Sequence, residues 1–140
     1  MPHLRVLLAD DNPTDRFLAQ EAFDEQELPV ELTLCESGAE ALAYMHSHHG
    51  HLPDVLLLDI NMPGMTGLDV LAEMKKSPEL FHIPVVMLTT SQDNADVEAA
   101  YTLQANSYLV KSPDFQGFLE QIEAFITYWR GNRFRYTRQA

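Results

Sequence analysis

The chain has 140 residues, of which 46% are hydrophobic, and a formal net charge of −12. This size and composition are typical of one globular domain, and the acidic balance argues against nucleic acid as the main partner. No apolar run approaches the roughly 18 residues of a membrane span, and the amino terminus lacks the pattern of a signal peptide.

Five short apolar runs along the chain are typical of strands in a covered sheet. They span Leu4–Ala9, Glu31–Cys35, Val55–Leu58, Ile83–Leu88 and residues 106–110. The single cysteine, Cys35, lies in the second run and cannot form an internal disulfide. We therefore expect a buried thiol in a reducing compartment, which indicates a cytoplasmic protein.

Helical patterns alternate with these runs. They are expected at about residues 13–27, 38–48, 67–76, from 91–93 onward, and 114–129. Asn12 and Pro13 are typical of a helix start, and Ser37 with Glu40 predicts a capping box. The alternation predicts an α/β fold: a doubly wound, five-stranded parallel sheet, flavodoxin-like, in strand order 2-1-3-4-5.

Reactive side chains stand directly after four of the five runs. They are Asp10, Asp11, Asp59, Thr89 and Lys111. Because the carboxyl ends of parallel strands meet at one edge of a sheet, we expect these side chains in one crevice. Acids that ligate Mg²⁺, a carboxylate nucleophile, and a cation and a hydroxyl for phosphoryl oxygens together predict a phosphoryl-transfer site.

These marks resemble the receiver domains of two-component response regulators, as in chemotaxis regulators, over about residues 4–129. The resemblance rests on Asp10-Asp11, on Asp59 before Met62-Pro63-Gly64, on Thr89 after Ile83-Pro84-Val85, and on Lys111 after Tyr108. Within the family, residues 9–15 and the Tyr128-Trp129 ending are most similar to single-domain regulators that partner bacterial phytochrome histidine kinases.

The resemblance implies a role for each residue. Asp59 is the expected phosphoacceptor for a sensor histidine kinase. Mg²⁺ is expected on Asp10, Asp11, Asp59 and the backbone carbonyl of Asn61. Lys111 and Thr89 would hold phosphoryl oxygens, and Tyr108 would turn inward when Thr89 moves. The protein would then be a phosphoacceptor that assists its own phosphorylation and dephosphorylation, and not an enzyme.

Two positions depart from the family pattern. Ser112 stands where the family usually has a proline joined to the lysine by a cis peptide bond, and Pro113 comes one residue later. A cis bond before serine would cost about 2.5–4 kcal/mol, so either the loop is strained or its path differs. Thr90 stands where the family often has alanine or glycine, and its larger side chain is expected to crowd the site.

Three other functions were weighed. A haloacid-dehalogenase-type phosphatase needs a general acid where this chain has Asn61, and a flavin-binding module needs a phosphate loop in place of the anionic Asp10-Asp11. A receiver-shaped adaptor that works without phosphorylation is the alternative that the sequence leaves open.

Four histidines lie between His46 and His51. His46 and His49, three residues apart, would be able to share a transition metal. Because no acid or cysteine is near them in the sequence, a solvated helix end is the expected reading.

The surface outside the site carries the remaining predictions. The first helix has a wide stripe, Phe17, Leu18, Ala22 and Phe23, which either packs inward or contributes to a kinase-docking surface as in the resembled family. The fourth helix has a thin stripe and is expected to be mobile. The last helix has a wide aromatic stripe, which predicts a homodimer through the face made by the fourth helix, fifth strand and fifth helix, with a well-packed monomer as the alternative.

The expected division of the chain is a receiver domain at 1–129 and a basic tail at 130–140 without an output domain. The tail holds Arg130, Arg133, Arg135 and Arg138, and either contacts an acidic partner or is a solvated end.

Overall fold

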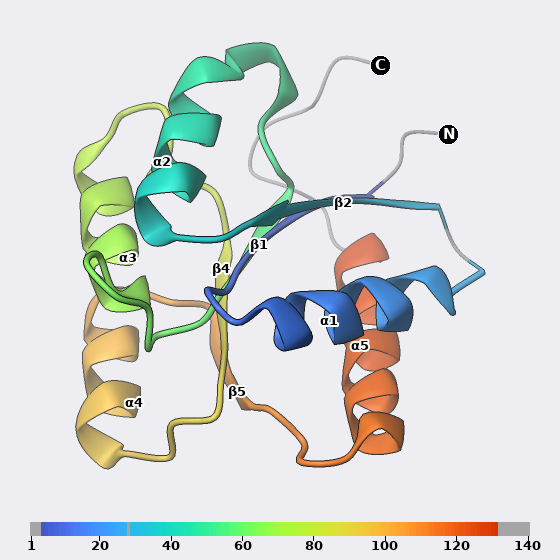
Figure 1. The fold of residues 1–140 in the computed structure, drawn as a ribbon. Helices are drawn as coiled ribbons and strands as arrows, with labels where there is room; N and C mark the ends of the chain where they lie inside the picture. Colours follow the sequence, from blue (N-terminus) through green and yellow to red (C-terminus); the bar gives the residue numbers. More distant parts are fainter. Residues whose placement is uncertain (1–3, 28, 132–140) are drawn as a thin grey trace.

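The computed structural model describes residues 4–27 and 29–131. The strands are β1 (Leu4–Ala9), β2 (Val30–Cys35), β3 (Val55–Leu58), β4 (Val85–Thr89) and β5 (Ser107–Val110). The helices are α1 (Pro13–Asp24), α2 (Gly38–Ser47), the short 3-10 helix η1 (His49–His51), α3 (Gly67–Lys76), α4 (Asn94–Thr102) and α5 (Phe115–Arg130). The strands form one parallel sheet in the order β2-β1-β3-β4-β5, which confirms the predicted fold (Figure 1).

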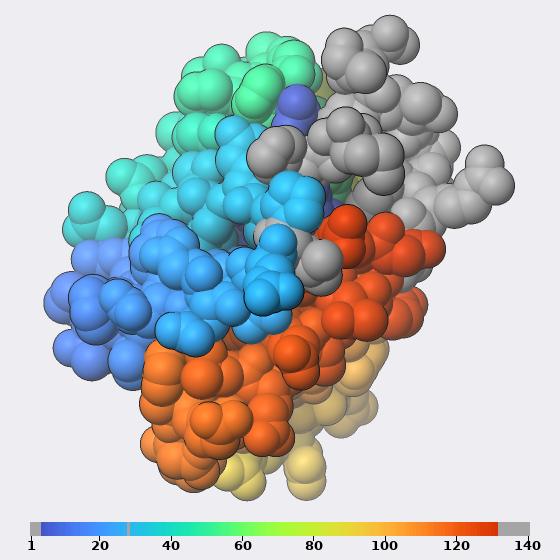
Figure 2. Space-filling view, turned by 90° about the vertical axis from the view of Figure 1, so that its right-hand side faces the viewer, coloured from blue at the N-terminus to red at the C-terminus, as the bar shows by residue number. Residues whose placement is uncertain are grey.

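Helices cover both faces of the sheet because alternate residues of the central strands point to opposite sides. In β3, Leu56 and Leu58 pack with α2, α3 and Ala100 of α4, while Val55 and Leu57 pack with α1 and α5. Figure 2 shows α1 and α5 side by side over the second of these faces. All four residues of β3 are buried, as a strand covered on both sides requires.

The register of the strands brings the candidate site residues together. Ala9 pairs with Leu58, so Asp10 and Asp59 leave neighbouring strands at the same level, and the Asp59 N–H donates to the Ala9 carbonyl at 3.0 Å. On the other side of β3, the N–H of Lys111 donates to the carbonyl of Thr89 at 2.9 Å. Both acids, the hydroxyl and the lysine therefore meet at the carboxyl edge of the sheet, as predicted from the alternation.

Helix α1 begins as expected, with the Asn12 side chain accepting hydrogen bonds from the N–H groups of Thr14 and Asp15. It ends at Asp24, earlier than the predicted residue 27. Phe23 and Ala22 are buried, but Phe17 is 62% exposed, so the interpretation in which the whole stripe packs inward is wrong.

At the start of α2, Ser37 accepts from the Glu40 N–H as predicted. The Glu40 carboxylate, however, accepts from the N–H of Glu36 and not of Ser37, so the reciprocal half of the predicted capping box is displaced by one residue. A complete capping box occurs instead at the start of α3, between Thr66 and Asp69.

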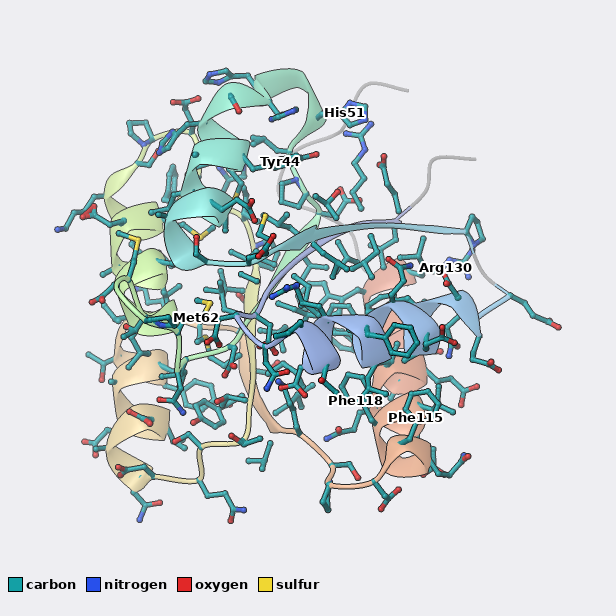
Figure 3. The ribbon with its side chains drawn as sticks, viewed as in Figure 1. Tyr44, His51, Met62, Phe115, Phe118 and Arg130 are labelled. Carbon is teal, nitrogen blue, oxygen red and sulfur yellow. The ribbon has the colours of Figure 1, made fainter. Side chains whose placement is uncertain are left out.

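The helices α4 and α5 are anchored very differently. Helix α4 buries Ala100 alone, in agreement with the thin apolar stripe of its sequence. Helix α5 buries Phe118, Ile122, Phe125, Ile126 and Trp129. Figure 3 shows Phe115 and Phe118 in the first turns of α5, of which Phe115 is 40% exposed. Most of the wide aromatic stripe of α5 is therefore used inside the fold.

Cys35 lies at the end of the edge strand β2 and is 2% exposed, as predicted. Burial, followed by the charge of Glu40, raises the pKa of its thiol to about 12. Among the described residues, no helix combines the length and apolar character needed to cross a bilayer. Phe134, Tyr136 and all tail arginines except Arg130 lie outside the described residues.

Candidate functional site

Three carboxylates converge at the carboxyl edge of the sheet. One oxygen from each of Asp10, Asp11 and Asp59 lies within 4.8 Å of the other two, and within the described ranges these are the only acids, histidines or cysteines that meet in a group of three. Asp10 is buried, Asp59 is half-buried and Asp11 is exposed, so the group opens to solvent on one side. Acidic oxygens in this number suit a hard divalent cation such as Mg²⁺.

Asp59 holds an unusual position for a carboxylate. Its Oδ1 atom is buried and has no hydrogen-bond partner among the described residues. Burial raises the pKa of Asp59, and the opposing effects of the Lys111 charge and of the neighbouring Thr89 hydroxyl do not cancel this rise. An orphaned buried carboxylate oxygen is costly in a folded chain, and it is the atom that a cation or a phosphoryl group would satisfy.

The backbone around Asp59 is fixed by Gly67 at the start of α3. A Cβ atom at Gly67 would collide with the carbonyl oxygen of Asp59, so only glycine permits this close approach. The N–H of Gly67 also donates to the carbonyl of Ile60 at 3.0 Å. These contacts therefore fix the turn between Asp59 and Gly67, and with it the backbone position from which the Asp59 carboxylate extends. The predicted metal ligand in this turn, the Asn61 carbonyl, stays a prediction.

Lys111 reaches into the carboxylate group from β5. Its Nζ lies 2.6 Å from Asp10, 3.0 Å from Asp15 and 4.0 Å from Asp59. Burial alone would lower the pKa of Lys111, but the hydrogen bond and charge of Asp10, with Asp59 and Asp15, outweigh it and the pKa is raised. The side chain therefore stays charged and within reach of Asp59.

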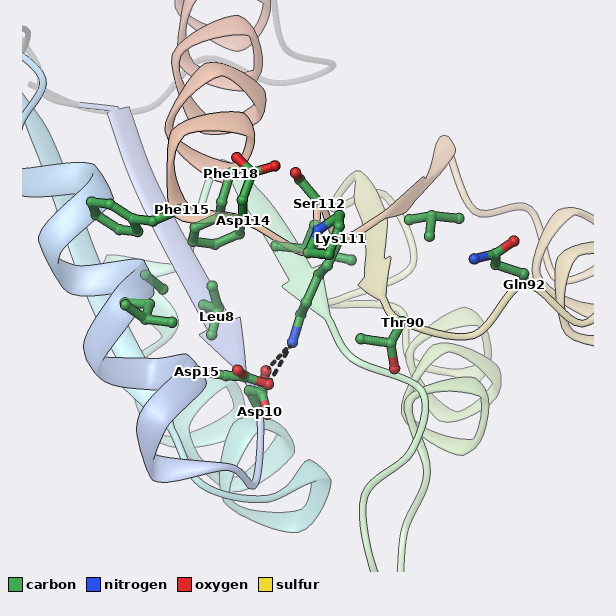
Figure 4. A pocket seen from close by; sticks show the side chains of 15 residues that line it. Leu8, Asp10, Asp15, Thr90, Gln92, Lys111, Ser112, Asp114, Phe115 and Phe118 are labelled. Carbon is green, nitrogen blue, oxygen red and sulfur yellow. Dashed lines mark hydrogen bonds and ion pairs between the residues drawn. The ribbon is translucent and has the colours of Figure 1, made fainter.

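Asp15, in the first turn of α1, is a site residue that was not predicted from the sequence. Its carboxylate lines a pocket of about 400 Å³ between α1 and the start of α5, beside Lys111 (Figure 4). Nothing in the local pattern distinguished Asp15 from a solvated helix residue, because its partner lies 96 residues away.

On the opposite side of the site, Thr89 is fully buried and its hydroxyl accepts a hydrogen bond from the Ser91 N–H at 3.2 Å. Tyr108 donates its hydroxyl to the Ser91 carbonyl at 3.0 Å. Ser91 in turn donates its own hydroxyl to Asp96 of α4 at 2.6 Å. The two residues predicted to form a switch, Thr89 and Tyr108, are therefore linked through one residue that also contacts α4.

The peptide bond after Lys111 is trans, because the described residues contain no cis peptide bond. Of the two possibilities raised by Ser112, the loop follows a path without the cis bond. Thr90 is exposed and lines the same pocket as Lys111, at the mouth of the site, where the sequence analysis expected it to crowd the opening.

The histidine cluster has an acid beside it, contrary to the reading from the sequence. The carboxylate of Glu79, in the turn after α3, contacts the rings of both His46 and His49, and His51 lies 3.9 Å from Glu31. Each of these side chains is about half exposed, and they do not bring three ligand atoms together as the aspartates do. This end of α2 therefore presents histidine–glutamate contacts at the surface, which the local sequence did not indicate.

Comparison with known proteins agrees with this geometry. The sequence model of the response regulator receiver domain family matches residues 6–123 of this chain. The response regulator Rcp1 of Synechocystis sp. is 35% identical over 89% of this chain and 87% of its own length. A crystal structure of the phosphorylated cyanobacterial phytochrome response regulator RcpA has a TM-score of 0.89 and 33% identity, covering 96% of this chain and 100% of that one. The Mn²⁺-bound form of Rcp1 has a TM-score of 0.84 and 34% identity, over 99% and 100% of the two chains.

Proposed function

The chain belongs to the response regulator receiver family, and we propose that it is a single-domain regulator that accepts a phosphoryl group on Asp59 from a phytochrome-type sensor histidine kinase. The observation that carries this proposal is the buried Oδ1 atom of Asp59, which the fold leaves without a partner between a lysine and two further carboxylates. The relatives support the assignment, since one is described as phosphorylated and as a phytochrome response regulator.

The proposed reaction transfers a phosphoryl group between two side chains. An oxygen of Asp59 attacks phosphorus, the bond from phosphorus to the kinase histidine breaks, and its electron pair returns to the imidazole. A cation held by Asp10, Asp11 and Asp59, with the Asn61 carbonyl, would neutralise charge on the phosphoryl oxygens. Mg²⁺ is the proposed ion; a relative is described as Mn²⁺-bound, which supports a divalent cation, and the three carboxylates are the group of acids here that suits one.

Lys111 and Thr89 complete the proposed site. Lys111 already lies 4.0 Å from Asp59, so a small movement of its ammonium group would place it on a phosphoryl oxygen. Thr89 would donate its hydroxyl to another oxygen, and Tyr108 would follow it through Ser91. Thr89 and Tyr108 would thus have one arrangement without the phosphoryl group and another with it. Because the phosphoryl group makes different contacts in the two, it shifts the population toward the second and so changes the α4-β5-α5 surface.

The proposed partners are proteins, with neither nucleic acid nor a membrane among them. The exposed Phe17 on α1 supports docking of a kinase on that helix, and the proposed output is altered protein contacts, including a homodimer through the α4-β5-α5 face. The exposed Tyr128 on α5 supports this face, although most aromatic residues of that helix are buried. A cytoplasmic location and a receiver at 1–129 with a basic tail belong to the same proposal.

The test is phosphotransfer from a phytochrome-type histidine kinase in Mg²⁺ and in EDTA, with size-exclusion chromatography before and after. Labelling is expected in wild-type protein and in the control Glu73→Gln, an exposed acid of α3 away from the proposed docking helix, and not in Asp59→Asn. Unchanged labelling of Asp59→Asn would contradict the acceptor assignment. No labelling from the kinase or from a small phosphodonor would favour the unphosphorylated adaptor. Labelling with the same elution volume would remove the dimer from the output.

A further inference from the structure

The loop after Lys111 lacks the proline that usually follows the lysine in the family, so its backbone must be held by other contacts. This chain has Ser112 after the lysine, and the peptide bond between them is trans. The backbone of Lys111 decides where its side chain starts, and the ammonium group must reach Asp59 from there. The contacts around this loop therefore determine how well the lysine is placed.

We propose that Gln121 of α5 is the positioning residue for Lys111, through a side-chain bridge that spans the lysine on both sides. The Oε1 atom of Gln121 accepts the N–H of Ser112 at 2.9 Å. Its Nε2 atom donates to the carbonyl of Val110 at 2.8 Å. One amide group thus fixes the residue before Lys111 and the residue after it. The proposal rests on the phosphoacceptor function given above.

The bridge depends on serine at position 112. Proline has no backbone N–H, so a proline there would remove the donor that the Gln121 oxygen accepts. Serine supplies that N–H, and the amide of Gln121 matches it with one acceptor and one donor. In this chain, therefore, a hydrogen-bonded bridge from α5 holds the loop. It takes the role that the ring of a proline at position 112 would have in stiffening the backbone.

The helix that carries Gln121 is a firm base for such a bridge. Ile122, its neighbour, is 1% exposed and lies in the core between α1, α5 and the sheet. The first turn of α5 also closes onto the loop, because a Cβ atom at Gly117 would collide with the Ser112 hydroxyl. Asp114 caps this turn by accepting the Gly117 N–H at 2.7 Å. The loop is thus held to α5 at Val110 and Ser112, by a helix whose inner face is buried in the core.

The predicted consequence is a change in the position of the Lys111 ammonium group. With the bridge intact, Nζ lies 4.0 Å from Asp59 while it bonds Asp10 and Asp15. Without it, the loop is held by the Lys111 N–H bond to Thr89 and by the cap of α5, and the lysine loses its fixed approach to Asp59. Misplacement of a catalytic group by about 1 Å costs up to about 100-fold in rate, so a loss of about 10-fold is expected.

The experiment compares Gln121→Leu, which removes both bonds, with Gln121→Glu, which keeps only the acceptor. Gln116→Leu is the matched control, because Gln116 is an exposed glutamine of the same helix that contacts Glu120. The readouts are hydrogen exchange at the Ser112 amide, the nuclear magnetic resonance shift of the Lys111 side chain, and the rate of phosphorylation by a small phosphodonor in Mg²⁺. Each Gln121 variant is also made together with Lys111→Ala.

In Gln121→Leu, faster Ser112 exchange, a shifted Lys111 resonance and a roughly 10-fold slower rate are expected, with a smaller loss in Gln121→Glu and none in the control. In the Lys111→Ala background the further loss should fall below about 2-fold, because the two residues act as one unit. Unchanged exchange at Ser112, an unchanged Lys111 resonance, or an equal loss with and without Lys111 would overturn the proposal. If wild-type protein takes no phosphoryl group, the phosphoacceptor function fails, while the exchange and resonance measurements still decide whether Gln121 positions Lys111.

Discussion

Helices α4 and α5 both follow strands that end at the site, yet they are held in opposite ways. Helix α5 buries five residues and is joined to the Lys111 loop by Gln121. Helix α4 buries only Ala100, and its polar link to the site passes through Ser91 and Asp96. The lysine is thus attached to the more deeply anchored helix, and the threonine and tyrosine are linked through Ser91 to the weakly anchored one, which is expected to move.

Under the proposed function, this difference would let one small site both bind a phosphoryl group and signal that it is bound. A group that must meet Asp59 in fixed geometry needs a buried support, which α5 provides. Thr89 and Tyr108, which would report phosphorylation, need a neighbouring helix with a second position of similar free energy. Helix α4, with one buried residue, is suited to that role.

Shortening an apolar side chain should lower the free energy of unfolding more in α5 than in α4. Ile122→Ala in α5 is expected to lower the free energy of unfolding by about 2–5 kcal/mol, because it leaves a cavity in a closed core. Val97→Ala in α4 should cost less than about 1.5 kcal/mol, since Val97 is only half-buried. Urea unfolding of both variants measures the difference. Equal costs would mean that α4 is anchored as firmly as α5.

The ionised carboxylate of Asp59, which lies between the α4 side and the α5 side of the site, should lower the free energy of unfolding. Because burial raises the pKa of Asp59, the folded state favours its protonated form. The penalty is therefore absent below the ordinary carboxyl pKa of about 4 and fully present once the pH exceeds the raised value. Asp59→Asn is expected to raise the free energy of unfolding at pH 7 by about 1–3 kcal/mol in EDTA, and by less near pH 4. Urea unfolding at both pH values tests it, and a gain that grows toward low pH would contradict the sign.

The smallest effect should come from the link between the site and α4. Ser91→Ala removes the hydroxyl that donates to Asp96 and accepts from the Asp93 N–H, at an expected cost of about 0.5–1.5 kcal/mol. Hydrogen exchange should then become faster in α4 and stay unchanged in α5. The exposed neighbour Gln92→Ala serves as control. Equal acceleration in both helices would remove Ser91 as the specific link.

The sequence predicted those parts of the molecule that local pattern determines. Alternating strand and helix patterns led to the strand order, and acids directly after strands led to Asp10 and Asp59 at one edge. The thin stripe of α4 likewise indicated a weakly anchored helix, and the structure buries only Ala100 in it. Periodicity and strand ends are contained in a few consecutive residues, and the strand order follows from the regular alternation of such segments along the chain.

The parts that were missed depend on partners far along the chain. Asp15 and Gln121 look like ordinary helix residues until the fold brings Lys111 to the first and Ser112 to the second. The same holds for Glu79, which contacts one histidine from α2 and one from η1. Helical periodicity says which face of a helix is apolar, but it does not say which polar residue will face a given loop.

The buried thiol of Cys35 has a practical consequence for observing this division in solution. Maleimide reagents and oxidants react with the thiolate, which a pKa of about 12 and 2% exposure make scarce and inaccessible in the folded protein. Since the chain has no other cysteine, one cysteine introduced on the surface of α4 would be labelled selectively. A fluorophore or spin label can thus be placed on the helix that is expected to move, while the native core stays unaltered.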